Sequence, residues 1–306
     1  MKNMIEYYYN IRIDELYNKK DYYFFDISGN YYIFKPYSNS LDRSNDIYNI
    51  NMFLNNMIRM DNIILNRYNE PTTNINNVNY ILIRKNDEYS LSLVNIANMA
   101  NMNNMYLLNM HNLERNNWEM LWSNMIDYYE EQIGENTKKY PLIRESIDYY
   151  IGLTENAISY IVNTKNNIHK EISDTMVLSH NTLEEGLNDP ENIILDHKAR
   201  DVAEYIKWSF FNNNKNIFNE LDEYFKYNYY SFYGIQILFG RVLYPSFYFN
   251  IYDKIISNKI DEKELNIIIS KNKEYERYLY DIYLYLSRYY ALAVPEWIKK
   301  QGTNPR

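Results

Sequence analysis

One stretch of the chain, residues 176–211, restricts the possible folds more than any other part. It contains two short apolar runs, Met176–Leu178 and Ile193–Leu195, separated by a polar loop with Gly and Pro. Short apolar runs bounded by Gly and Pro are typical of strands. A helical pattern follows from Asp201, which precedes Glu204 by three residues, as an N-cap precedes N3 in a capping box. The predicted order is therefore strand, loop, strand, acidic corner, helix.

The polar residues at the ends of these two runs are the candidates for chemistry. The first run leads into His180-Asn181-Thr182, and the second ends on Asp196. This order resembles kinase-like phosphotransferases, in which the first strand leads to an H-x-D loop with the catalytic Asp and the next delivers an Asp that holds magnesium. By that resemblance Thr182 stands where the base is expected. Asp196 stands at the metal position, and Asp201 matches a later Asp that caps a helix.

Three segments resemble one family more closely: DHKARDVAEYIK from residue 196, GRVLYP, and VPEWIKK near the C-terminal end. They resemble the YutH-type proteins, the CotS-related family of endospore coat proteins, over nearly the whole chain. The resemblance implies an α+β, two-lobed protein-kinase-like (aminoglycoside phosphotransferase-like) fold in a single domain, residues 1–306. The small lobe, 1–85, would hold an antiparallel sheet, and the larger lobe, 86–306, would be mainly helical. It also implies synthesis in the mother-cell cytoplasm, deposition in the spore coat, and other coat proteins as partners.

Composition narrows the classes of function. The net charge of −8 does not attract a phosphate backbone, so we expect no nucleic-acid partner. With no cysteine, disulfides, thiolate metal sites and cysteine nucleophiles are excluded. We expect no secretory signal and no membrane span, because the apolar runs are too short. The 36 Tyr residues fit the codon bias of an AT-rich genome, with oxidative cross-linking as the alternative interpretation.

The first part of the chain predicts a hairpin with strands at Tyr22–Ile27 and Tyr31–Lys35, joined by Ser-Gly-Asn, in which Gly and Asn can adopt positive φ. By resemblance, Lys35 matches the strand Lys that meets nucleotide phosphates; the alternative is an ordinary Lys at a strand end. A helix is predicted over Ser40–Arg59. Its only acidic residues are Asp, so it offers no Glu to pair with Lys35.

Later patterns predict a mainly helical region, with a lobe boundary near Lys85–Tyr89. Arg241 lies in an almost wholly apolar run, and a buried Arg needs an acidic partner, so we expect Arg241 to be structural, like Arg200 and Asp201. The other predicted strands are Ile63–Asn66, Thr72–Ile75 and Tyr80–Arg84, and the other predicted helices are Leu91–Met105, Asn112–Gln132, Ile143–Val162, Ile217–Tyr227, Glu262–Ile269 and Tyr275–Tyr290.

The two histidines beside the acidic corner allow two interpretations. His180 and His197 could form a small metal site with Asp196, although their spacing matches no familiar motif. We favour the other interpretation, in which the ring nitrogens of each His bond to neighbouring backbone groups.

Phosphoryl transfer needs a phosphate cradle, a metal site and a group that positions the nucleophile. The segment Tyr17–Asp21 has no Gly, so its amides cannot easily close on phosphates. Thr182 cannot accept a proton at neutral pH as a carboxylate does. Lys35 and Asp196 would remain as a vestigial site for ATP and Mg²⁺. We therefore predict a non-catalytic structural protein without a small-molecule substrate. The alternatives are an ATP-dependent small-molecule phosphotransferase and a nucleotide-binding pseudokinase.

Overall fold

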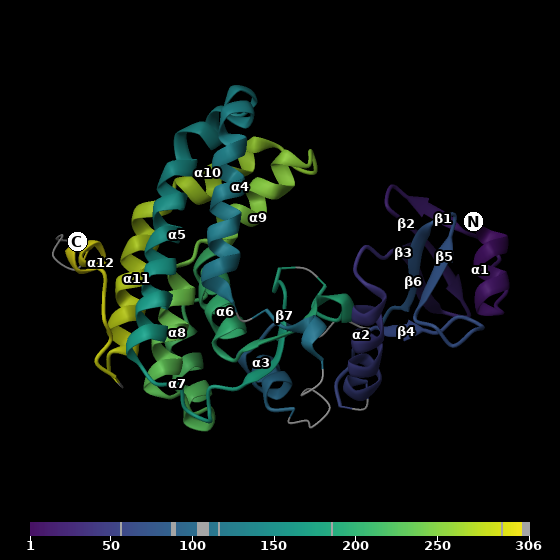
Figure 1. Cartoon of the computed structure of the whole chain (residues 1–306), viewed down its shortest axis with the longest axis horizontal. Helices are drawn as coiled ribbons and strands as arrows, with labels where there is room; N and C mark the ends of the chain where they lie inside the picture. Colours follow the sequence, from purple (N-terminus) through teal and green to yellow (C-terminus); the bar gives the residue numbers. More distant parts are fainter. Residues whose placement is uncertain are drawn as a thin grey trace. The chain divides into compact units, whose positions relative to one another are not determined.

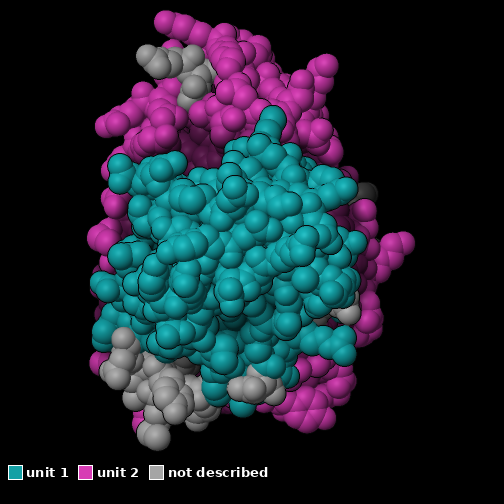
Figure 2. All heavy atoms as spheres, turned by 90° about the vertical axis from the view of Figure 1, so that its right-hand side faces the viewer, with its two compact units in different colours: residues 1–91, 102–114, 180–195 teal, residues 92–101, 115–179, 196–306 magenta. Residues whose placement is uncertain are grey.

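The computed structural model (Figure 1) describes residues 1–55, 57–86, 90–102, 110–115, 117–184, 186–288 and 290–301. The chain divides into two compact units, coloured separately in Figure 2. Unit 1 comprises residues 1–91, 102–114 and 180–195. Unit 2 comprises residues 92–101, 115–179 and 196–306. Segments 102–114 and 180–195 thus belong with the N-terminal unit, although the sequence predicts them in the helical lobe. The boundary predicted at Lys85–Tyr89 lies partly outside the described residues.

Unit 1 contains an antiparallel sheet with the strand order β1-β2-β3-β6-β4, in which β5 also pairs with β6. In the part of the chain that the structure describes, its strands are β1 (Tyr17–Lys19), β2 (Tyr22–Ile27), β3 (Asn30–Pro36), β4 (Asn62–Ile64), β5 (Thr72–Ile75) and β6 (Val78–Arg84). The predicted hairpin between β2 and β3 is confirmed. Ile27 pairs with Asn30, so the loop is Ser28-Gly29, and both residues have positive φ. Asn30, predicted in the loop, is the first residue of β3. The loop therefore has two residues, and their positive φ values match the twist of the flanking strands.

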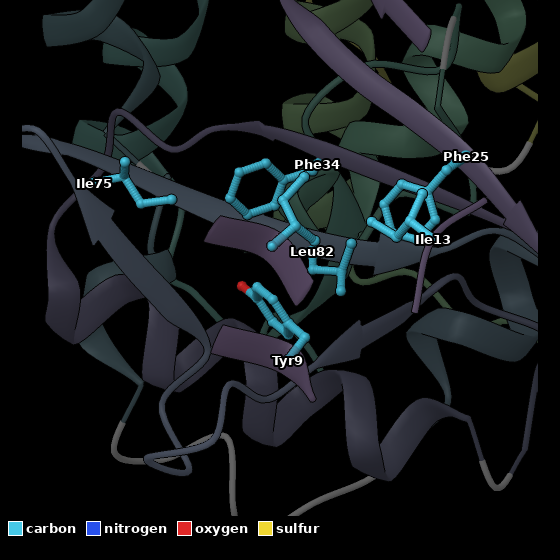
Figure 3. Close-up of a cluster of buried hydrophobic side chains, with 7 residues drawn as sticks. Tyr9, Ile13, Phe25, Phe34, Ile75 and Leu82 are labelled. Atoms are coloured by element: carbon cyan, nitrogen blue, oxygen red, sulfur yellow. The ribbon is translucent and has the colours of Figure 1, made fainter. Parts of the chain in front are cut away.

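The core of unit 1 lies between this sheet and α1 (Lys2–Tyr9), a segment that the sequence left open between strand and helix. Side chains from α1, β2, β3, β5 and β6 meet there (Figure 3). Fully burying one such side chain stabilises the fold by about 1.5–3 kcal/mol. The cluster consists of Ile5, Tyr9, Ile13, Phe25, Phe34, Ile75 and Leu82.

The helix α2 (Leu41–Leu54) follows β3 and starts where the sequence predicts. The Ser40 hydroxyl accepts the Arg43 N–H at 3.2 Å, which satisfies one of the free donors of the first turn. The helix ends five residues before the predicted end at Arg59. Met57, inside the predicted range, is 58% exposed and lies beyond the helix. The run of Asn residues near this end explains the error, since Asn has a low helix propensity.

Unit 2 is mainly helical. Its longest helix, α5 (Pro141–Asn167), begins with Pro at N1, where the missing N–H costs nothing. Gly240 in α8 (Phe232–Leu243) allows close packing on α5, because a Cβ there would lie 2.6 Å from Ile161 Cδ1. The remaining helices of unit 2 are α3 (Leu93–Ala100), α4 (Trp118–Lys139), α6 (Ala199–Phe211), α7 (Ile217–Tyr227), α9 (Ser246–Ile256), α10 (Leu265–Ile269), α11 (Asn272–Leu286) and α12 (Glu296–Gln301).

Short elements complete the description. The predicted strands of the opening stretch are present as β7 (Met176–His180) and β8 (Ile193–His197), which pair with each other. The 3₁₀ turns among the described residues are η2 (His111–Leu113), η3 (Pro190–Asn192) and η4 (Glu262–Glu264).

Other predicted helices also differ from the structure in their bounds. The helix predicted from Asn112 begins at Trp118, after the turn η2, and the one predicted over Leu91–Met105 is α3, while residues 103–105 lie outside the described part.

Buried Tyr hydroxyl groups should make the fold sensitive to alkaline pH. Burial raises the pKa of Tyr9 in unit 1 and of Tyr224 in unit 2 to about 12, from an ordinary value of 10.0. Between these values the unfolded chain loses protons that the folded chain keeps. The contribution of each of these Tyr hydroxyls to the free energy of unfolding is therefore fully present below pH 10.0. It is lost, by about 3 kcal/mol per residue, as the pH rises through the folded pKa.

We expect denaturant titrations above pH 10.0 to show this loss, and Tyr9→Phe to reduce its slope. Tyr31→Phe is the matched control, since Tyr31 is 65% exposed. Equal slopes in the wild type and in Tyr9→Phe would contradict the assignment to this hydroxyl.

Candidate functional site

In unit 1 the candidate phosphate-binding residue already has anionic partners. Lys35 Nζ lies 2.6 Å from Asp189 Oδ2 and 2.5 Å from Glu191 Oε2, and all three side chains are partly buried. Burial alone would lower the pKa of Lys35, but the two carboxylates raise it above its usual value. Burial raises the pKa of Glu191 despite the nearby ammonium. Lys35 thus forms a half-buried ion cluster with the chain's own carboxylates.

The loop that carries these two carboxylates is held by Asn192. The Asn192 side chain accepts the Thr182 N–H at 2.9 Å and donates to the carbonyl oxygens of Thr182 and Gly186 at 2.9 and 3.1 Å. Asp189 caps η3 by accepting the Glu191 N–H at 3.0 Å. The Asn192 amide therefore stabilises the loop from within.

The degenerate H-x-D positions lie at the start of this loop. His180 is buried, and the Asn181 N–H donates to the Asn192 carbonyl oxygen at 2.7 Å. The Thr182 hydroxyl accepts the Glu184 N–H at 3.3 Å. Thr182 therefore acts as a turn residue here, and its hydroxyl offers no base for a nucleophile.

The expected position of a phosphate-binding loop is a tight turn. Lys19 pairs with Tyr22 across β1 and β2, so only Lys20 and Asp21 connect the two strands. Lys20 has a φ of +36°. Two residues without Gly present few free amides, whereas a phosphate cradle needs several that converge.

In unit 2, Asp196 is the next-to-last residue of β8 and has no exposed surface. Its oxygens accept the Trp118 indole N–H at 2.9 and 3.0 Å, the Arg200 Nη1–H at 2.7 Å and the His197 N–H at 2.7 Å. Three donors therefore occupy this carboxylate. A magnesium ion bound there would have to displace the indole or the guanidinium, so the environment does not fit a metal ligand.

His197 positions the start of α6. Its Nδ1 accepts the Ala199 N–H at 3.1 Å, which fixes the hydrogen of the neutral ring on Nε2, 3.6 Å from Asp174 Oδ1. Burial lowers the pKa of His197, although Asp174 opposes this shift. This contact is of the kind we favoured for His197.

The predicted capping box at Asp201 is wrong. The helix α6 begins at Ala199, two residues earlier, and its N-cap, Lys198, makes no side-chain cap. His197 satisfies one free donor instead. Asp201 lies in the first turn, where a carboxylate stabilises the helix dipole. Glu204 is therefore not a capping residue.

Glu204 is the acidic partner that the buried Arg241 requires, and the sequence did not identify it. Its Oε1 lies 3.0 Å from both Arg241 Nη2 and Lys207 Nζ, and its Oε2 accepts the Ser246 hydroxyl at 2.6 Å. Burial opposes ionisation of Glu204, but the two cations and the hydroxyl lower its pKa to about 2. The sequence signal was available: Arg241 needed an acid, and Glu204 lies beside apolar residues of a helix.

Lys207 and Arg241 connect this carboxylate to its surroundings. Lys207 Nζ also donates to the carbonyl oxygens of Tyr244 at 2.9 Å and Arg241 at 3.4 Å, and so caps the end of α8. The Arg241 guanidinium lies 4.4 Å from the Trp118 ring centre, a cation–π contact. Since Trp118 donates to Asp196, one buried network joins Asp196 to Glu204.

A small cavity of about 170 Å³ lies in unit 2. Lys165 on its wall is already paired with Glu119 at 2.7 Å. Small-molecule pockets typically have about 300–1,000 Å³, so this cavity is too small for a nucleotide. Its lining residues are Asn117, Trp118, Lys165, Lys170, Met176, His197, Tyr233 and Ile237.

Within the described ranges, no three His, Asp or Glu side chains are grouped so that they could hold a metal ion, and the alternative site of His180, His197 and Asp196 is not formed. Across the same residues, no helix combines the length and apolar character that crossing a bilayer requires.

An antiparallel sheet followed by a mainly helical unit, with Lys35 on β3 and Asp196 on β8, defines the two-lobed kinase-like fold. The aminoglycoside phosphotransferase from Alicyclobacillus acidocaldarius subsp. acidocaldarius DSM 446 is 11% identical, with a TM-score of 0.64 and coverage of 94% of this chain and 97% of that chain. Spectinomycin phosphotransferase APH(9)-Ia, solved with ADP and spectinomycin, is 11% identical, with a TM-score of 0.59 and coverage of 98% and 96%. At such identities the similarity shows the fold alone.

The model of the family described as "Spore coat putative kinase YutH" matches residues 2–282, and the chain belongs to this family. The endospore coat-associated protein YutH of Bacillus subtilis (strain 168) is 28% identical over an alignment of 213 residues, and the match covers 61% of this chain. The matched region spans 62% of that relative's length. The predicted family and the predicted fold class are both confirmed.

Proposed function

We propose that this protein is a non-catalytic structural component of the bacterial endospore coat. It would be made in the mother-cell cytoplasm, deposited in the coat, and act through contacts with other coat proteins. Membership of a spore coat family and the name of the Bacillus subtilis relative support the location. The side chains at the candidate nucleotide site support the absence of catalysis.

The environment of Asp196 carries this proposal. A metal-binding Asp needs oxygens that face an ion, but this carboxylate is fully buried and bonded to Trp118 and Arg200. The carboxylate that would bind a metal ion in a phosphotransferase would here neutralise the charge of Arg200. Its role is then to hold unit 2 together.

Lys35 supports the same conclusion from unit 1. A nucleotide phosphate would compete with two carboxylates that contact the ammonium at 2.5–2.6 Å. It would also approach Asp189 and Glu191, and their negative charge would repel it. Together with Thr182 at the position of the base, this arrangement favours a scaffold over an enzyme.

The alternative is an ATP-dependent small-molecule phosphotransferase or a nucleotide-binding pseudokinase. One observation favours it: Lys35 lies on β3 of a sheet in the same fold as known phosphotransferases. In that case nucleotide would displace the two carboxylates.

Thermal unfolding with millimolar Mg·ATP separates the two functions. A ligand at 100 times its dissociation constant stabilises the folded state by about 2.7 kcal/mol, which is readily detected. We expect no shift in melting temperature for the wild type, and none for Lys35→Met. Asp196 variants are unsuitable for this assay, because the fold itself depends on Asp196.

A clear shift that Lys35→Met removes would overturn the proposed function in favour of the alternative. Lys85→Met, which removes a cation of unit 1 that pairs with Asp61, is the matched control. A shift that both variants retain would show nucleotide binding away from Lys35 and would also contradict the proposal.

A further inference from the structure

One exposed group of side chains in unit 1 has no part in the site described above. The Arg67 guanidinium carbon lies 4.5 Å from the ring centre of Tyr7 on α1 and 5.9 Å from that of Tyr68. The two rings are 54% and 58% exposed. We call these three residues the Tyr-Arg-Tyr surface. Met4, one helical turn before Tyr7, is also exposed and extends it with apolar area.

The loop that presents this surface is rigidly built around the buried side chain of Asn66. Asn66 Oδ1 accepts the N–H groups of Tyr68 and Glu70 at 2.8 and 3.1 Å. Its Nδ2 donates to the Thr72 carbonyl oxygen at 2.9 Å and to the Thr73 hydroxyl at 3.2 Å. One side chain thus makes four bonds that fix the loop.

The backbone joins the loop to α1 as well. The Arg67 N–H donates to the Tyr8 carbonyl oxygen at 2.7 Å, and the Asn66 N–H donates to the Glu70 carbonyl oxygen at 2.9 Å. Asn69 adopts a φ of +61° to close the turn. A surface whose backbone is fixed in advance loses less conformational entropy when a partner binds.

The Arg67 guanidinium is exposed. Among the described residues, no carboxylate forms an ion pair with its guanidinium, although Asp and Glu number 40 in the sequence. The guanidinium lies over two rings, and the N–H donors at its edge can bind a carboxylate through two bonds. Tyr and Arg are also the residues that most often dominate binding energy in protein interfaces.

We propose that the Tyr-Arg-Tyr surface is a docking site for a segment of another protein that presents a carboxylate beside an aromatic or aliphatic side chain. The carboxylate would pair with Arg67, and the apolar side chain would lie on Tyr7, Tyr68 and Met4. This inference deepens the proposed function, on which it rests, because it names one contact through which a coat protein would assemble.

A pair of synthetic peptides tests the surface. The first is acetylated and amidated Asp-Phe-Asp-Tyr, and the second is the same peptide with Asn in place of Asp. We expect saturable binding of the acidic peptide to the full chain by calorimetry. Arg67→Gln should weaken it by about thirtyfold, the smallest loss that marks an interface residue as a hot spot. Arg12→Gln is the matched control: it removes an exposed Arg from unit 1 that has no Tyr ring against it.

Equal binding of both peptides, equal losses in the two Arg variants, or no saturable binding would overturn the proposal. Each Arg variant must first melt at the wild-type temperature, which the exposure of both side chains leads us to expect. Self-association of the wild type that Arg67→Gln abolishes in sedimentation would support the surface and identify a second copy as the partner. The absence of peptide binding does not change the result of the Mg·ATP assay, so failure of this inference and failure of the proposed function are distinguishable.

Discussion

Asp196→Ala should lower the free energy of unfolding by about 3–5 kcal/mol, the cost of breaking a buried ion pair by removing one partner. The variant leaves the Arg200 guanidinium without this carboxylate, and the Trp118 indole N–H without an acceptor. Both groups are buried, so water cannot easily replace the lost bonds. Urea denaturation followed by circular dichroism measures the change.

The matched control is Asp127→Ala, on the exposed side of α4, which should change stability by less than about 0.5 kcal/mol. The double variant Asp196→Asn with Arg200→Met removes both charges and should recover part of the loss, because neither ion then remains buried alone. A stable Asp196→Ala protein would show that this carboxylate does not support the fold. That result would contradict the structural role of Asp196 on which the proposed function depends.

Glu204→Gln should lower the free energy of unfolding at neutral pH by about 3 kcal/mol, since the folded pKa of about 2 lies well below the ordinary 4.5. The variant leaves Lys207 and Arg241 buried with no carboxylate between them. Because the folded pKa is lowered, the contribution of Glu204 is fully present above pH 4.5 and is lost as the pH falls through about 2.

The stability difference between wild type and Glu204→Gln should therefore shrink as the pH falls below 4.5. The control is Glu223→Gln on α7, whose ion pair with Lys226 is exposed and should contribute little at any pH. A difference between wild type and Glu204→Gln that stays constant down to pH 3 would contradict the assigned ionisation.

The family and the order of elements were readable from the sequence because they depend on local patterns. Apolar periodicity gave α7 its bounds, and the Ser-Gly-Asn turn gave the hairpin of β2 and β3. The residue types at the H-x-D positions showed that a carboxylate is absent at Thr182. These features need only neighbouring residues and the chemistry of single side chains.

The tertiary structure alone decided which charges meet. Lys35 and Asp189 are 154 residues apart, and no local pattern pairs them. Glu204 followed the spacing of a capping box, yet it serves Arg241, because a buried guanidinium requires a nearby carboxylate more strongly than a helix end requires a cap. The sequence thus determined the helices and strands and the absence of a carboxylate at position 182. The tertiary structure determined which of the remaining charged side chains form ion pairs.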